Sequence, residues 1–109
     1  MECEIKKEGR YSVISLSGEI DLHCSAEARS AILSELATQQ SILVDLSGVK
    51  YIDSSAVASL VEGYQMAKHA NLEFILVAVS QEALQVLKLA RLDKVFVIQP
   101  SVDDVLKAS

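Results

Sequence analysis

An alternation of short apolar runs with amphipathic segments, beginning at Ser41, constrains the fold most. Three apolar runs are predicted to be strands, over residues 41–46, 72–79 and 94–98, and the first two are expected to be buried. Each is followed by a predicted helix, over residues 54–69, 81–91 and 101–108. Strands that alternate with helices form parallel sheets with right-handed crossovers, so the sequence predicts an α/β fold with a mostly parallel sheet.

The clearest predicted helix covers residues 54–69. One face carries apolar residues at the i, i+3, i+4, i+7 spacing, namely Val57, Leu60, Val61 and Tyr64. The opposite side is expected to carry Ser59, Glu62, Gln65 and Lys68. This pattern predicts a helix that packs on the sheet with one side and faces water with the other.

The first third of the chain predicts a hairpin and one more helix. Residues 2–8 and 10–17 read as two strands joined at Gly9, and residues 24–38 as a helix. The Gly18–Asp21 turn and the Ser47-Gly48 pair are expected to end the second and third strands. We therefore predict one domain over residues 1–109, with helices packed on the sheet and an antiparallel strand at its edge.

Composition limits the classes of function. Of the 109 residues, 50% are hydrophobic and 23% are charged, which is typical of a folded chain, and the net charge is −5. An acidic chain without a Lys/Arg stripe is not expected to bind nucleic acid or an anionic membrane. The N-terminus does not resemble a signal peptide, and no apolar stretch is long enough to enter a membrane as a spanning helix. We expect a cytoplasmic protein.

Two predicted loops meet at one rim of the sheet because the carboxyl ends of parallel strands lie together. One is Gly18–Asp21 and the other runs from Leu46 to Ser54, so Asp21 and Ser54 are expected to share a surface. The run Asp53-Ser54-Ser55 has two interpretations. An Asp or Ser can cap the helix that follows, or Ser54 can accept a phosphate, which a helix N-terminus stabilises.

Three segments carry a resemblance to a known family. The run Val-Asp-Leu-Ser-Gly-Val-Lys-Tyr-Ile-Asp-Ser-Ser-Ala over residues 44–56 resembles the signature of STAS domains, in particular bacterial anti-sigma factor antagonists. The turn Gly18-Glu19-Ile20-Asp21 is similar to a loop of that family, and residues 87–96 resemble its C-terminal stretch. Together they span nearly the whole chain.

The resemblance implies a protein-binding regulator rather than an enzyme, and one without a cofactor. In that family the serine after the Asp is phosphorylated by a partner kinase that is also an anti-sigma factor, and a phosphatase removes the phosphate. Carried over, Ser54 is the phosphoacceptor. The partner-binding surface would comprise Asp21, Asp53, Ser54, Ser55 and Ala56.

Ala56 departs from the family, which often has Gly there. Its methyl group is expected to lie beside the phosphorylation site, where a kinase approaches. This departure keeps an alternative open, since STAS-like proteins also serve as regulatory subunits of lipid-transport ABC complexes.

Other chemistry finds little support. There is no G-x-S-x-G elbow and no phosphate-binding loop. Asp21, Asp45 and Asp53 could hold a metal only if they converged, and Asp45 has the simpler role of bonding loop N–H groups. The cysteines and histidines, Cys3, Cys24, His23 and His69, show no metal-ligand spacing. Leu89 falls partly outside the apolar stripe of its helix, so it, with Leu92, is either a contact surface or part of a wider buried face.

Overall fold

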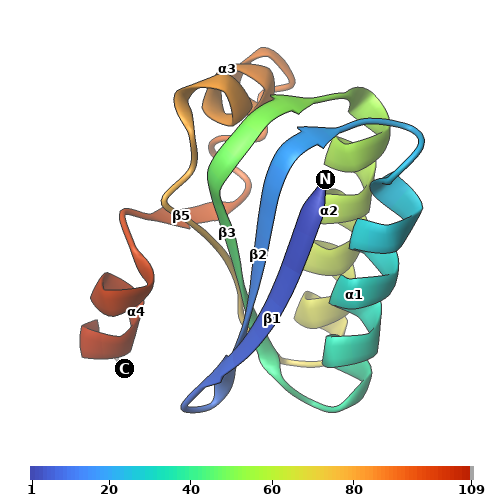
Figure 1. Cartoon of the computed structure of the whole chain (residues 1–109). Coiled ribbons are helices and arrows are strands. Elements are labelled where there is room, and N and C mark those ends of the chain that lie inside the picture. The colour runs from blue at the N-terminus through green and yellow to red at the C-terminus, as the bar shows by residue number, and fades with distance from the viewer. Residues whose placement is uncertain (109) are drawn as a thin grey trace.

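The computed structural model describes residues 1–108 and contains five strands and four helices in the predicted order (Figure 1). The strands are β1 (Glu2–Glu8), β2 (Tyr11–Ile20), β3 (Ser41–Ile52), β4 (Phe74–Val77) and β5 (Val97–Gln99). The helices are α1 (Ser25–Ala37), α2 (Ser54–His69), α3 (Gln81–Leu89) and α4 (Val102–Ala108). Within residues 1–108, no helix has the length and apolar character needed to cross a bilayer.

The strands form one sheet in the order β1-β2-β3-β4-β5. β1 pairs with β2 antiparallel, and all other pairs are parallel. The two-residue turn between β1 and β2 begins at Gly9, whose φ of 63° suits a tight hairpin. The predicted α/β fold with an antiparallel edge strand is therefore confirmed.

Two strands are longer than predicted. β2 continues through Gly18 to Ile20, and β3 continues through Gly48 to Ile52. The glycines do not end the strands because the β2–β3 ladder absorbs two register shifts, between Ser15 and Ser17 and between Gly18 and Glu19. Gly18 adopts φ 84° at the second shift, a conformation that glycine accepts readily. At the other end of the chain, the strand predicted over 72–79 shortens to β4. The strand predicted over 94–98 is displaced to β5, because residues 93–95 form a turn.

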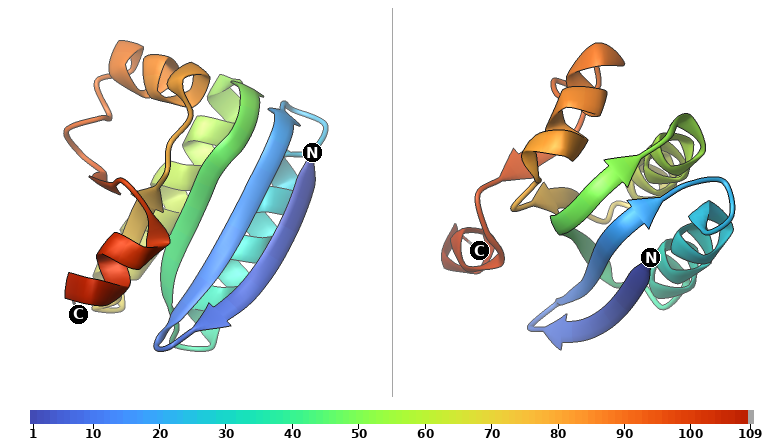
Figure 2. Two further views of the ribbon diagram at one scale, coloured as in Figure 1. Left: turned by 60° about the vertical axis from the view of Figure 1, so that its left-hand side comes forward. Right: turned by 45° about the horizontal axis from the view of Figure 1, so that its top comes forward.

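Helices cover the two faces of the sheet unequally (Figure 2). Residues of α1, α2 and α3 pack with Ile14, Val44 and Leu76 in the larger core. Val105 of α4 packs with Tyr11 and Leu43 in a smaller core on the other face. Because side chains alternate along a strand, β3 supplies Leu43 to one core and Val44 to the other.

The buried face of α2 is wider than predicted, because the helix packs against α1 as well as against the sheet. Its buried residues include Ala56, Ser59, Leu60 and Gly63, whereas Val61 and Tyr64 are half-buried. Placing Ser59 on the solvent side was wrong, since its hydroxyl donates to the carbonyls of Ser25 (3.4 Å) and Ser55 (3.2 Å). The small residues allow close packing: a Cβ on Gly63 would lie 2.6 Å from Cγ2 of Ile32.

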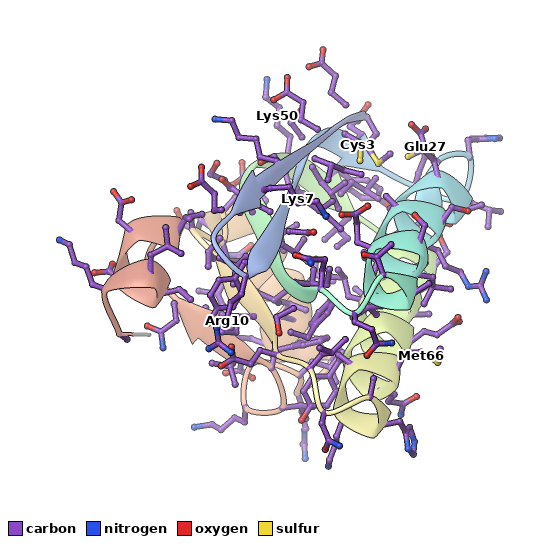
Figure 3. All side chains as sticks on the ribbon, turned by 90° about the horizontal axis from the view of Figure 1, so that it is seen from below. Cys3, Lys7, Arg10, Glu27, Lys50 and Met66 are labelled. Carbon is purple, nitrogen blue, oxygen red and sulfur yellow. The ribbon has the colours of Figure 1, made fainter. Side chains whose placement is uncertain are left out.

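Polar contacts fasten the end of the sheet where β1 turns into β2. Figure 3, which views the molecule from below, shows Lys7 and Arg10 at this end. Lys7 forms an ion pair with Glu35 of α1 (2.8 Å), and the buried Ser12 hydroxyl donates to the same carboxylate (2.7 Å). These contacts lower the pKa of Glu35, with Lys7 as the largest cause.

Candidate functional site

The rim where β2 and β3 end brings two distant loops together. Ile20 pairs with Ile52 at the end of the parallel ladder. One residue further, the backbone N–H of Asp53 donates to the Ile20 carbonyl over 3.1 Å. The Asp21 loop and the start of α2 are thus adjacent, as the strand-end argument predicted.

Asp53 caps α2. Its backbone is extended, with φ −102° and ψ −179°, and its Oδ1 accepts a 3.1 Å hydrogen bond from the backbone N–H of Ala56. The same oxygen accepts a 2.6 Å bond from the hydroxyl of Ser55. Of the two readings of Asp53-Ser54-Ser55, the cap belongs to the Asp and leaves both serines out of that role.

The carboxylate of Asp53 is held in its charged form. Its pKa lies below the ordinary value, chiefly because the Ser55 hydroxyl donates to it. The backbone N–H groups of Ala56, Ser55 and Leu22 lower it further, while partial desolvation opposes them. The Asp21 loop therefore adds, through Leu22, to the lowering of the Asp53 pKa.

Ser54 differs from Ser55 in exposure and bonding. It is exposed at the first position of α2, and its hydroxyl makes no side-chain hydrogen bond with any of residues 1–108. Ser55 is half-buried and donates to Asp53. Of these two serines, Ser54 alone has a hydroxyl that is exposed and makes no hydrogen bond with residues 1–108.

Asp21 organises the loop before α1. Its Oδ1 accepts from the backbone N–H of His23 (3.0 Å), and its carbonyl accepts from the N–H groups of Cys24 (3.1 Å) and Ser25 (2.9 Å). The Sγ of Cys24 lies 3.6 Å from the same carboxylate oxygen. The carboxylate is half-buried at the rim, so it shapes the loop and also adds negative charge next to α2.

Ala56 does not lie where the sequence suggested. Its side chain is only 3% exposed and packs in the larger core, so the methyl group points away from any approaching partner. The expectation that this methyl crowds the phosphorylation site is wrong. The reason is helical phase: Ala56 shares the buried face of α2 with Leu60, one turn later. Ala56 consequently gives no ground for favouring the ABC-transporter reading.

Two apolar side chains at the rim were not predicted from the sequence. Leu22 is 72% exposed in the loop after Asp21, and Tyr51, which pairs with Glu19, is 51% exposed. Leu22 does carry a signal in the sequence, since it is an apolar residue between a strand and a helix and belongs to no periodic stripe. Tyr51 gives none, because which face it occupies depends on the register shifts of the ladder.

The structure offers no donor set for a metal within residues 1–108, where no three His, Cys, Asp or Glu side chains gather. Asp45 accepts from the Ser47 backbone N–H over 2.9 Å, so it bonds a nearby backbone N–H as expected, but within the bulged part of β3 and not in a loop. Cys3 and Cys24 are free thiols that pack against the larger core. His23 and His69 are exposed.

Leu89 and Leu92 differ in solvent exposure. Leu89 is 86% exposed, so the wider buried face does not include it. Leu92 is half-buried against the larger core.

Comparison with known proteins assigns the chain to a family. The model of the STAS domain matches residues 2–105, and the chain therefore belongs to the STAS domain family. The resemblance stated from the sequence is confirmed.

Solved structures agree over nearly the full length. An anti-sigma factor antagonist from Mycobacterium paratuberculosis is 28% identical, with a TM-score of 0.85, and the match covers 98% of this chain and 92% of that one. A putative anti-sigma factor antagonist from Thermotoga maritima, 18% identical, has a TM-score of 0.88 over 97% of this chain and 92% of the other. The Bacillus cell fate determinant SpoIIAA in its phosphorylated form, also 18% identical, has a TM-score of 0.79 and 98% coverage of both chains.

Proposed function

We propose that this protein is an anti-sigma factor antagonist whose binding to a partner anti-sigma kinase is switched by phosphorylation of Ser54. The observation that carries the proposal is the exposed, uncommitted Ser54 hydroxyl beside a capped helix start. The anti-sigma factor antagonist from M. paratuberculosis supports the class, and the phosphorylated form of SpoIIAA supports a switch of this kind on this fold.

The switch would work through charge. A phosphate adds roughly −1.5 to −2 charges at neutral pH. On Ser54 it would stand next to the Asp53 carboxylate, with Asp21 in the adjoining loop. The helix dipole favours an anion at this end, so the fold tolerates the phosphate. A partner surface that fits the unmodified rim would instead meet an unpaired charge, which is costly to bury.

The unmodified rim offers both polar and apolar contacts. Leu22 is 72% exposed in the loop that follows Asp21, next to the start of α2. A single exposed leucine is ordinary on a protein surface, so what implicates Leu22 is its position, within reach of a partner that binds at Ser54. We infer that the partner covers Leu22 when Ser54 is unmodified and leaves it when Ser54 carries a phosphate.

In this proposal the protein binds other proteins and catalyses no reaction. It needs no cofactor or metal, and it binds neither nucleic acid nor membrane. A kinase and a phosphatase, both separate proteins in the cytoplasm, would add and remove the phosphate.

Competition binding tests the proposal. The anti-sigma serine kinases of the source organism are purified, each in complex with its sigma factor, and the antagonist is added in increasing amounts. Wild type and Ser54→Ala should release the sigma factor at similar concentrations, since neither carries charge at position 54. Ser54→Asp should need far more protein, and Ser55→Ala serves as the matched control that keeps Ser54.

If no kinase complex releases its sigma factor, the proposal fails. Binding to a transporter ATPase instead would favour the regulatory-subunit alternative.

A further inference from the structure

The outer edge of β1 is an unpaired strand edge seven residues long. β1 lies at the end of the sheet, and no segment within residues 1–108 pairs with its outer side. It contains no proline, and Ile5 at its centre is 45% exposed. Such an edge presents unpaired N–H and C=O groups that can pair with another strand.

The pairing in the hairpin determines which residues of β1 direct their backbone N–H and C=O groups away from β2. Glu8 pairs with Tyr11 on either side of the two-residue turn, which makes them a hydrogen-bonded pair. Hydrogen-bonded pairs alternate along an antiparallel ladder, so Lys6 and Glu4 also bond toward β2. Cys3, Ile5 and Lys7 therefore direct their backbone groups to the free edge.

The side chains of β1 match a second copy of β1 running antiparallel. With a two-fold axis through Ile5, Ile5 faces its own copy and Glu4 faces Lys6 of the other chain, twice by symmetry. Glu4 and Lys6 lie on the same face of the sheet, because they are two residues apart. Neither forms an ion pair within residues 1–108, so both charges are available.

Neighbouring registers fit less well. An axis through Glu4 sets two Glu4 carboxylates opposite each other, and an axis through Lys6 does the same with two ammonium groups. Like charges directly opposite destabilise a strand pair. The Ile5 register also pairs all seven residues. Its unfavourable pair, Glu2 with Glu8, also occurs twice by symmetry, but it falls at the two ends of the contact, where water screens the repulsion.

We propose that the protein forms a symmetric dimer in which the β1 edges of two copies pair antiparallel about Ile5, joining the two five-stranded sheets into one continuous sheet. The occupant of this edge is a second copy of the chain, recognised by the Glu4–Lys6 pairs. The inference does not depend on the phosphorylation of Ser54, which lies at the start of α2 and outside the contact.

Charge-exchange variants test the pairing by analytical ultracentrifugation up to millimolar protein. Wild type should associate reversibly as a dimer. Glu4→Lys or Lys6→Glu alone puts like charges opposite each other twice, and should weaken association about tenfold or more. Mixing the two single variants should restore dimerisation as a heterodimer, since one chain then carries lysine and the other glutamate at both positions.

The double variant Glu4→Lys/Lys6→Glu should also dimerise. Lys107→Glu, on exposed α4, makes the same change of net charge as Lys6→Glu but away from β1, and should associate like wild type. A wild type that stays monomeric overturns the proposal, and so does a dimer that Glu4→Lys leaves unchanged.

Oxidative cross-linking tests the register independently. Paired residues at the axis have Cα atoms about 5.5 Å apart, within reach of a disulfide. Ile5→Cys in a Cys3→Ser/Cys24→Ser background should therefore cross-link to a covalent dimer. In a Cys24→Ser control the two Cys3 residues would lie about 15 Å apart and should not cross-link. Equal cross-linking of both proteins would contradict the Ile5 register.

Discussion

The hydroxyl of Ser55 donates a 2.6 Å hydrogen bond to the carboxylate of Asp53, two residues earlier. Because of this contact, the three residues at the start of α2 have different roles. Asp53 caps the helix, Ser55 supports the cap, and Ser54 stands free between them. The difference in exposure and hydrogen bonding explains why a kinase need not treat the two consecutive serines alike.

The Asp53–Ser55 contact has a pH signature. Ser55→Ala removes the largest cause of the lowered Asp53 pKa, so that pKa should rise toward its ordinary value. A group whose folded-state pKa is lowered stabilises the fold above its unfolded pKa, and this contribution is lost as pH falls through the folded pKa. The stabilisation by the ionised Asp53 carboxylate should therefore persist to a lower pH in wild type than in Ser55→Ala. Carboxyl NMR titration measures the shift, and Ser54→Ala, which should leave the pKa in place, is the control.

Leu22 should matter for the partner and not for the fold. It is 72% exposed, so Leu22→Ala should change the free energy of unfolding by less than about 0.5 kcal/mol. Fewer than about 30% of interface side chains cost more than about 1 kcal/mol when truncated, and they are the well-buried anchors. As an anchor covered by the partner, Leu22 should lose more than about 1 kcal/mol of binding free energy on truncation to Ala. Leu89→Ala, at another exposed leucine, is the matched control. Equal effects of both variants on kinase binding would remove Leu22 from the contact surface.

Gly63 should be required by packing. A Cβ there would lie 2.6 Å from Cγ2 of Ile32 and 2.9 Å from Cε2 of Phe74. Overpacking should make Gly63→Ala cost about 1–3 kcal/mol, although alanine is the better helix former. Adding Ile32→Ala, which removes the closest atom, should make the two costs less than additive in urea unfolding. A stabilised Gly63→Ala would show that α1 and α2 sit further apart.

The hydrogen bond from Tyr11 to Glu73 should stabilise the contact between the β1–β2 turn and the residue that precedes β4. The buried hydroxyl of Tyr11 donates to Oε2 of Glu73 (2.6 Å) and accepts from Arg10 (3.0 Å). Burial first, and the Glu73 contact second, raise the Tyr11 pKa. That stabilisation is complete below the unfolded pKa of tyrosine and is lost as pH rises through the raised one.

Tyr11→Phe should cost about 1 kcal/mol at neutral pH and should flatten the alkaline loss of stability. Thermal unfolding between neutral and strongly alkaline pH measures both effects. A Tyr11→Phe profile that runs parallel to that of wild type at alkaline pH would contradict this assignment.

Much of the fold was predictable because local sequence patterns, such as helical periodicity and short apolar runs, specify its helices and strands. Helical periodicity located α2, and the rule on strand ends brought Asp21 next to the start of α2. The lengths of β2 and β3 were not predictable, because the bulged ladder that continues past Gly18 and Gly48 depends on the partner strand. The tether between Tyr11 and Glu73 was missed for the same reason, since it joins residues distant in the sequence.

The direction of Ala56 was predictable and was missed. Ala56, Leu60, Gly63 and Ala67 recur at helical spacing and form the buried face of α2. Three of these residues are small, so they add little to an apolar stripe that is defined by large side chains. Small residues mark the face where a helix packs most closely, as the contacts around Gly63 show.

Phosphopeptide mapping after incubation with the partner anti-sigma kinase and ATP tests the central claim most directly. Wild type and Ser55→Ala should carry one phosphate, on Ser54, and Ser54→Ala should carry none. Phosphate on Ser55 of the wild type, or a Ser54→Ala protein modified as fully as wild type, would contradict the account.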